Sequence, residues 1–202
     1  MTKNISVVRT APYNYSIAGC NLYESFNQVA KKMIDPPILA SVNLLLIKKI
    51  TKENSNFETV YCSPRKRSVQ TAQLFSQNPT ILPELSEVCY EMENFIEPDS
   101  FFSASGTPQV QRARIAFVYA LVNNKLEETY QQVINRIESF LKIISKQKSN
   151  NKLIFSHGFI MKIMEAYIQD QSIKDTPSKL LQYFDGKSET FHFLEGFSFK
   201  LD

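Results

Sequence analysis

Three short apolar segments that end in polar residues constrain the fold of this chain more than any other feature. They are Asn4–Arg9, Phe57–Cys62 and Lys152–Ser156. Their length and their β-branched and aromatic content predict buried strands. Because helical patterns separate them, the sequence predicts a layered α/β fold with a mostly parallel sheet.

The clearest helical pattern covers Glu127–Gln147, because apolar side chains recur there on one face. Further helices are predicted from Pro37 to about Thr51, in residues 65–77 after Pro64, over Gln109–Val122, and after Gly158 through Tyr167. Pro79–Leu82 predicts a short strand, and the alternation around Glu195-Gly196 predicts a hairpin over Thr190–Leu201.

Length and charge narrow the class of protein. The chain has 202 residues, of which 43% are hydrophobic, which is enough for one core and predicts one domain over residues 1–202. Residues of about 88–125 lack a clear period and are expected to form an irregular, cap-like segment. A net charge of +3 is too small to indicate nucleic acid or a membrane surface as the partner.

Cysteine and histidine usage argues against a metal centre. The three cysteines show no paired spacing and the chain has only two histidines, so we expect no metal site and no cofactor. Free thiols fit a reducing compartment. The sequence shows no leader-like start and no apolar run long enough to span a bilayer, so a soluble cytoplasmic protein is expected.

The ends of the three predicted strands carry the residues that could do chemistry. Arg9 ends the first strand, Arg65 and Arg67 follow the second, and His157 follows the third. Carboxyl ends of parallel strands gather ligands, and guanidinium groups match phosphate oxygens in a bidentate way. Each residue alone is also typical of an exposed side chain or a turn. Together they predict a cationic pocket that binds phosphate.

Two segments carry a specific resemblance to a known family. "YCSPRKRSVQTAQLF" (Tyr61–Phe75) resembles the SSPLxRAxQTA segment of the histidine phosphatase superfamily, phosphoglycerate-mutase-like branch, with Arg67 on the motif arginine. "LIFSHG" (Leu153–Gly158) is similar to the segment that carries the second histidine of that family, which falls on His157. The resemblance implies a three-layer fold with helices on both faces of the sheet.

Weaker matches follow in the same order along the chain. "LPELSEV" (Leu82–Val88) resembles the segment with the proton-donating acid, which implies that role for Glu87. Glu128–Leu141 resembles a helix that carries an arginine, here Arg136. "SETFHFLE" (Ser188–Glu195) resembles the closing strand of the family.

The departures from the family pattern concern the catalytic step. The family signature near the N-terminus is Arg-His-Gly, and this chain has Arg9-Thr10-Ala11, followed by Pro12 in place of a polar residue. A common arginine of the family aligns with Lys162. The resemblance therefore implies a divergent member that keeps a phosphate pocket of Arg9, Arg67 and His157, while Thr10 replaces the nucleophilic histidine.

Threonine is a poor replacement for that histidine. Its hydroxyl needs an adjacent base to become nucleophilic, and His157, the only nearby candidate, is implied to contact phosphoryl oxygens. Cys62 would be a substitute nucleophile only if its side chain faced the basic pocket. A small core thiol on a buried strand is the favoured interpretation of Cys62.

Three functions stay open from the sequence. The first is a protein that binds a phosphorylated or anionic small molecule, or a phosphopeptide, without turnover through phosphohistidine. The second is an enzyme of altered chemistry with Glu87 and His157 as acid and base and water as the nucleophile. The third is an interaction module that uses residues 85–126. The presence together of two arginines, a histidine and an acid at the expected site positions weighs against it. Side chains that could line the mouth, although core or surface roles suit each better, are Phe101, Phe102, Arg112 and Arg114.

Overall fold

The computed structural model of the chain describes residues 2–12, 35, 37–39, 47, 48, 50, 57–88, 109–184 and 191–201, with the backbone alone at 109–114. Its strands are β1 (Lys3–Arg9), β2 (Thr59–Cys62), β3 (Thr80–Ile81), β4 (Asn151–Ser156) and β5 (Gly196–Leu201). Its α-helices are α3 (Lys66–Gln73), α5 (Gln109–Val122), α6 (Tyr130–Lys146) and α7 (Gly158–Gln169). Short 3-10 helices are η1 (Pro83–Leu85), η3 (Gln171–Lys174) and η4 (Pro177–Tyr183).

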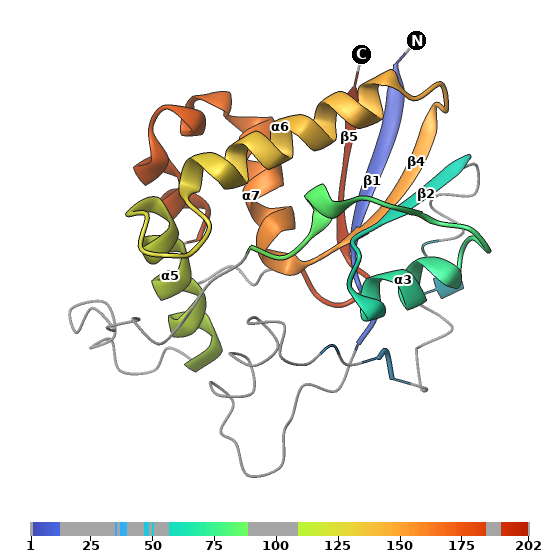
Figure 1. Cartoon of the computed structure of the whole chain (residues 1–202), viewed down its shortest axis with the longest axis horizontal. Helices are drawn as coiled ribbons and strands as arrows, with labels where there is room; N and C mark the ends of the chain where they lie inside the picture. The colour runs from blue at the N-terminus through green and yellow to red at the C-terminus, as the bar shows by residue number, and fades with distance from the viewer. Residues whose placement is uncertain are drawn as a thin grey trace.

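The strands form one sheet in the order β3-β2-β4-β1-β5 (Figure 1). The pairs β3-β2, β2-β4 and β4-β1 are parallel, and β5 alone runs antiparallel, to β1. The predicted mostly parallel sheet is therefore confirmed. Figure 1 shows both chain termini at the same end of the sheet, with α3 at the opposite end.

Alternating side chains along the strands build two cores on opposite faces of the sheet. Ile5, Val7 and Ile154 belong to the core that also holds the buried side chains of α6 and α7. Val8 and Phe155 belong to the second core, under α3. Because neighbouring strand residues point to opposite faces, these two cores confirm that helices cover both faces.

The helix predicted over Glu127–Gln147 is α6, and its start has a local cause. Thr129 accepts a hydrogen bond from the backbone N–H of Gln132, and the side chain of Gln132 accepts one from the backbone N–H of Thr129. This capping box satisfies two N–H groups that a helix start leaves without partners. The helix therefore begins at Tyr130, three residues later than the apolar pattern alone predicted.

The predicted hairpin over Thr190–Leu201 is wrong. Among the described residues 191–201, a turn at 193–194 precedes β5, the only strand there, which pairs with β1 from Lys3 to Val8. Leu194 has a φ of 60°, which turns the chain back onto the sheet edge. A Cβ atom at Gly196 would overlap the backbone carbonyl of Val7, so only glycine allows this close pairing.

Other predicted elements begin or end at different residues in the structure, or fall outside the described residues. The helix after Pro64 is shorter than predicted, since α3 ends at Gln73 and Leu74 is its C-cap. Of the helix predicted from Pro37 to Thr51, residues 37–39 are described and are not helical, whereas residues 47, 48 and 50 are helical. Of the cap-like segment, 89–108 lies outside the described residues, and α5 is a regular helix.

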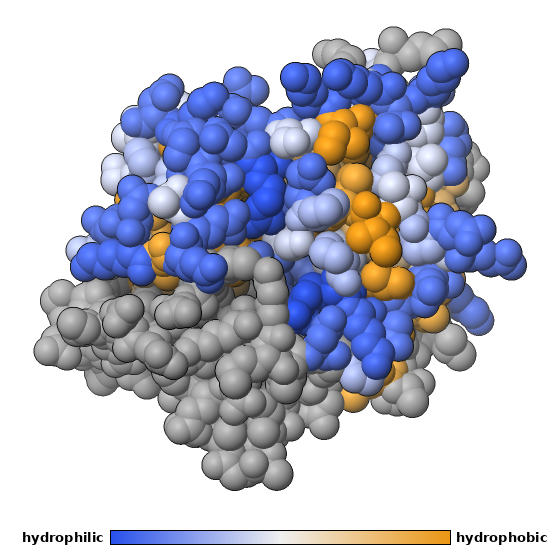
Figure 2. All heavy atoms as spheres, in the orientation of Figure 1, coloured by the Kyte–Doolittle hydropathy of each residue, from blue (hydrophilic) through white to orange (hydrophobic). Residues whose placement is uncertain are grey.

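On the face of the molecule that Figure 2 shows, most of the coloured residues are hydrophilic. Figure 2 shows one apolar band on the viewed face, which runs from α6 towards α3 between hydrophilic residues. No helix among the described residues is long and apolar enough to cross a membrane. Within the same residues, no group of three or more histidine, cysteine or acidic side chains is arranged to hold a metal ion.

Candidate functional site

Three strand ends meet at one edge of the sheet, as the sequence predicted. Arg9, at the end of β1, lies opposite Ser156 of β4, and Cys62, at the end of β2, lies opposite Phe155. The residues that follow these ends are Thr10, Ser63 and His157. Parallel pairing thus brings three distant parts of the chain together at the carboxyl edge of the sheet.

Helix α3 begins at this edge and presents two buried arginines. Arg67 is 0% exposed and Arg65 is 7% exposed. Ser68 and Thr71 of the same helix fix its position: the hydroxyl of Ser68 donates to the carbonyl of Phe155, and the hydroxyl of Thr71 accepts from the backbone N–H of Ala11. These bonds tie the helix to β4 and to the end of β1.

Two carboxylates face the two arginines. The Nη2 atom of Arg67 donates to Oε1 of Glu87, and Nη1 lies 3.3 Å from Oδ1 of Asp35. The Nε atom of Arg65 lies 3.2 Å from Oε2 of Glu87 and 3.7 Å from Oδ1 of Asp35. Each arginine therefore contacts both acids, and the four side chains form one cluster of balanced charge.

His157 lies beside this cluster and is 5% exposed. Its Nδ1 atom is 3.3 Å from Nη2 of Arg67 and 3.6 Å from Oε1 of Glu87, and its Nε2 atom is 2.6 Å from Oγ of Ser63. Burial lowers the pKa of His157 well below its usual 6.5, and the positive charges of Arg67, Arg65, Arg9 and Arg136 lower it further. The ring is therefore neutral near pH 7.

The hydrogen bonds of His157 also assign its proton. A guanidinium group only donates, so Nδ1 accepts from Arg67. The neutral ring then carries its proton on Nε2 and donates it to the hydroxyl of Ser63. In this tautomer His157 does not act as a base towards Ser63, so the pair is not an activated nucleophile.

Arg9 and Thr10, at the end of β1, lie beside the residues on either side of His157, which are Ser156 and Gly158. The guanidinium of Arg9 donates from Nη1 to the carbonyl of Phe191 at 2.6 Å and lies over the ring of Phe193 at 4.1 Å from its centroid. A Cβ atom on Gly158 would be 3.6 Å from Nε of Arg9, so the arginine passes beside the residue that follows His157. Thr10 is 1% exposed, and its backbone N–H donates to the carbonyl of Ser156 at 3.1 Å.

Glu87 is held in place by an arginine of α6. Arg136 donates from Nη1 to the carbonyls of Glu84 and Ser86 at 2.9 and 2.6 Å, and it forms a two-pronged ion pair with Glu128 at 2.8 and 2.9 Å. The arginine that the resemblance marked thus fixes the segment that carries Glu87. It contacts that segment rather than the Arg65–Arg67 pair.

A pocket of about 400 Å³ opens beside Glu87. Its lining residues come from the η1 region and the start of α6: Pro83, Ser86, Glu87, Glu127, Glu128, Gln132 and Arg136. Glu87 borders both this pocket and the arginine pair. A group bound to the arginines would therefore have room for an organic substituent next to Glu87.

Cys62 is a core residue, as favoured from the sequence. It is 0% exposed within the core under α3, and burial raises the pKa of its thiol to about 11. A protonated thiol is a poor nucleophile, so Cys62 is not an activated nucleophile.

Sequence reasoning missed Asp35 as part of the cluster and the bond between Ser63 and His157. The only signal for Asp35 was an acid in front of two prolines, a pattern that also marks an ordinary turn.

Lys162 pairs with Glu165 at 2.8 Å on α7. Predicted mouth residues Phe101 and Phe102, and the side chains of Arg112 and Arg114, lie outside the described residues.

One family model matches most of the chain. The model of the histidine phosphatase superfamily (branch 1) matches residues 46–183, more than half of the chain. That range includes Arg67, Glu87 and His157, and it begins after Arg9, Thr10 and Asp35. No curated protein matches the chain at a significant level.

Several solved structures share the fold at low sequence identity. A mycobacterial glucosyl-3-phosphoglycerate phosphatase in complex with VO3 is 10% identical, with a TM-score of 0.59 over 99% of this chain and 92% of that chain. A phosphoglycerate mutase from Bacillus anthracis is 15% identical, with a TM-score of 0.53 over 86% and 82%. A histidine-to-alanine mutant of phosphoserine phosphatase from Entamoeba histolytica, in complex with phosphoserine, is 13% identical, with a TM-score of 0.52 over 98% and 89%.

Proposed function

Since the chain belongs to the histidine phosphatase superfamily, we propose that it binds a phosphorylated small molecule at the carboxyl edge of its sheet and does not form a phosphohistidine. The phosphate-binding residues are Arg9, Arg67 and His157, and Thr10 takes the place of the nucleophile. The observation that carries the proposal is the cluster of buried Arg67 and His157 with Glu87 at the edge where Thr10 follows the end of β1.

The chemistry of the cluster supports an oxyanion ligand. Arg67 is fully buried, and its partners are the carboxylates of Glu87 and Asp35, so the site already holds anionic oxygens against this guanidinium. A guanidinium fork matches two phosphate oxygens, and Arg9 adds a second positive charge near His157. The protonated Nε2 of His157 donates a hydrogen bond without adding a charge. Structural relatives with bound phosphoserine or VO3 carry such groups in the same fold.

The position of Thr10 supports binding without covalent turnover. A hydroxyl attacks phosphorus only when a base removes its proton, and the lone pair of His157 on Nδ1 faces Arg67. Cys62 is protonated in the core. Among the described residues near Thr10, none therefore supplies an activated nucleophile in its place.

A second candidate is hydrolysis by water, and one observation favours it. The neutral imidazole of His157 lies 3.6 Å from Oε1 of Glu87, so a base and an acid adjoin each other. This reaction requires Glu87 in its protonated form. Water attacks phosphorus and gives its proton to His157, while protonated Glu87 gives its proton to the departing ester oxygen as the P–O bond breaks and becomes a carboxylate. The ligand would first have to separate Arg67 from Nδ1.

The test compares hydrolysis of p-nitrophenyl phosphate by the unaltered protein, Thr10→His and Thr10→Ala. The unaltered protein and Thr10→Ala are expected to stay at the rate of buffer, whereas Thr10→His gains at least about tenfold because the imidazole restores covalent catalysis. Robust turnover by the unaltered protein with no gain in Thr10→His would overturn the proposal.

The same assay separates the two candidate functions. If water hydrolysis occurs, turnover by the unaltered protein disappears in His157→Ala and no phosphoprotein accumulates. Glu87→Gln then loses turnover of an alkyl phosphate but keeps much of that of p-nitrophenyl phosphate, whose leaving group needs no proton. If the protein only binds, none of these variants differs from buffer, while phosphate still raises the melting temperature of the unaltered protein.

A further inference from the structure

Asp35 has an unusual set of partners for a residue that stands outside the helices and strands. Its Oδ2 atom accepts from the backbone N–H of Lys66 at 2.8 Å, the first residue of α3. Its Oδ1 atom accepts from Nη1 of Arg67 at 3.3 Å and lies 3.7 Å from Nε of Arg65. One carboxylate thus contacts a helix start and two guanidinium groups.

These three donors are the kind that bind a phosphate group. A helix start and arginine forks attract oxyanions, since both place N–H groups and positive charge on the ligand oxygens. Helix α3 offers no cap from its own sequence, because its N-cap residue is Arg65, which makes no side-chain cap bond. Asp35 therefore occupies positions that a bound phosphate would use.

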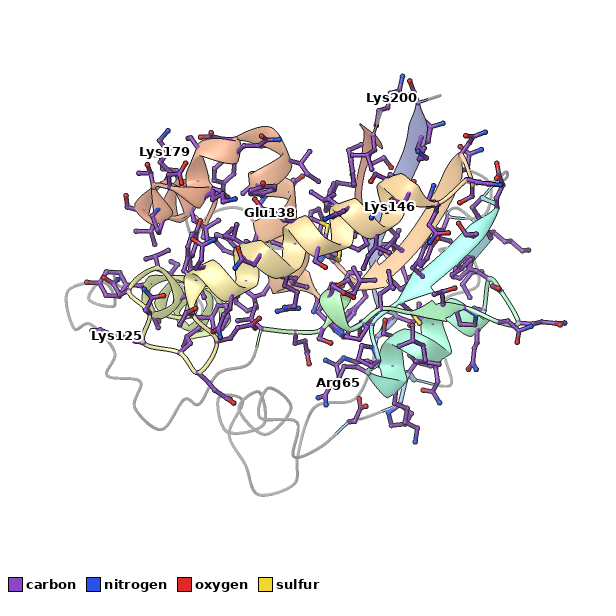
Figure 3. The ribbon with its side chains drawn as sticks, turned by 45° about the horizontal axis from the view of Figure 1, so that its top comes forward. Arg65, Lys125, Glu138, Lys146, Lys179 and Lys200 are labelled. Carbon is purple, nitrogen blue, oxygen red and sulfur yellow. The ribbon has the colours of Figure 1, made fainter. Side chains whose placement is uncertain are left out.

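The exposure of the two acids indicates which one yields to a ligand. The Asp35 side chain is 33% exposed and that of Glu87 is 18% exposed, while Arg67 is fully buried. Figure 3 shows Arg65 at the end of the molecule opposite Lys200, at the carboxyl edge of the sheet. An incoming anion reaches the arginines at the lowest cost by displacing the more exposed carboxylate.

We propose that the carboxylate of Asp35 competes with the ligand for the anion pocket, so that the ligand must displace Asp35 in order to bind. This exchange favours dianionic phosphate over monocarboxylates. The inference rests on the proposed phosphate-binding function. A monocarboxylate that replaces Asp35 exchanges one negative charge for another of the same size. A phosphate dianion brings one more negative charge to Arg65 and Arg67, so they attract it more strongly than they attract a monocarboxylate.

The test is titration of inorganic phosphate and of acetate at about pH 8 into the unaltered protein and Asp35→Asn. Asparagine keeps an oxygen that caps α3 but removes the charge. Phosphate is expected to bind Asp35→Asn about tenfold more tightly than it binds the unaltered protein. Acetate, at a concentration at which phosphate saturates the unaltered protein, is expected to leave the melting temperature of that protein unchanged. The control, Asp175→Asn, removes an equal charge from the exposed end of η3 and keeps the phosphate affinity of the unaltered protein.

A second variant, Asp35→Ser, keeps a hydroxyl cap and is expected to tighten phosphate binding in the same direction. The inference alone fails if the unaltered protein binds phosphate and neither Asp35 variant binds it more tightly, or if acetate binds as well as phosphate. If neither the unaltered protein nor the variants bind phosphate, the proposed function fails with it.

Discussion

The guanidinium of Arg136 donates to the backbone carbonyl of Ser86 at 2.6 Å, one residue before Glu87. The same side chain reaches the carbonyl of Glu84 and both oxygens of Glu128. Helix α6 therefore fixes the segment that places Glu87 against Arg67. The charge cluster at the sheet edge depends on an arginine that does not belong to it.

Replacement of Arg136 by alanine should destabilise the fold. It would remove the two-pronged ion pair with the half-buried Glu128 and the donor to two carbonyls, a loss of about 2–4 kcal/mol in the free energy of unfolding. Urea denaturation measures this loss. The control is Lys162→Ala, which breaks a similar pair to Glu165 and should cost less than about 1 kcal/mol. Equal losses in the two variants would contradict the role given to Arg136.

The depressed pKa of His157 predicts how stability changes with pH. The unfolded chain binds a proton at His157 near pH 6.5, whereas the folded chain keeps the ring neutral until the pH is well below that value. Protonation therefore favours the unfolded state, so stability is fully present above pH 6.5 and falls as the pH drops through the window below it.

Urea midpoints at about pH 7.5 and 5.5 test this sign, since the window lies above the usual range of carboxyl groups. The unaltered protein should lose more stability between the two pH values than His157→Gln. The control His192→Gln changes the other histidine and should keep the pH dependence of the unaltered protein. A His157→Gln variant with an unchanged pH dependence would show that the folded protein binds this proton after all.

The thiol of Cys62 should be inert in the folded protein. Its burial and its pKa of about 11 predict no alkylation by iodoacetamide at about pH 8, and rapid alkylation once guanidinium chloride unfolds the chain. Peptide mapping by mass spectrometry assigns the label to Cys62 and separates it from Cys20 and Cys89. Labelling of Cys62 in the native protein would reopen its role as a nucleophile.

The features that the sequence predicted correctly are local or repeat at a fixed spacing. Short apolar segments identified β1, β2 and β4, and the 61–75 and 153–158 motifs indicated where Arg67 and His157 would meet. Once strands pair in parallel, their carboxyl ends lie at the same edge of the sheet, so this meeting follows from the predicted fold. This is why both the fold and the core of the candidate site could be predicted.

The features that were missed depend on contacts between distant residues. Asp35 reaches Arg67 across 32 positions of the chain, and no period or motif records such a contact. The strand β5 was mistaken for part of a hairpin because alternation marks a strand but does not identify its partner. The turn at Leu194 and the close approach of Gly196 to Val7 decide that pairing instead.

Direct titration of inorganic phosphate tests the central claim, that the arginines and His157 at the sheet edge form an anion pocket. The unaltered protein and the control Lys146→Ala, at the far end of α6 (Figure 3), are expected to bind phosphate at millimolar concentration or below. Binding should weaken at least about tenfold in Arg67→Lys, which keeps the charge but loses the fork, and vanish in Arg9→Ala/Arg67→Ala. Equal affinity in all four proteins, or none in the unaltered protein, would contradict the account.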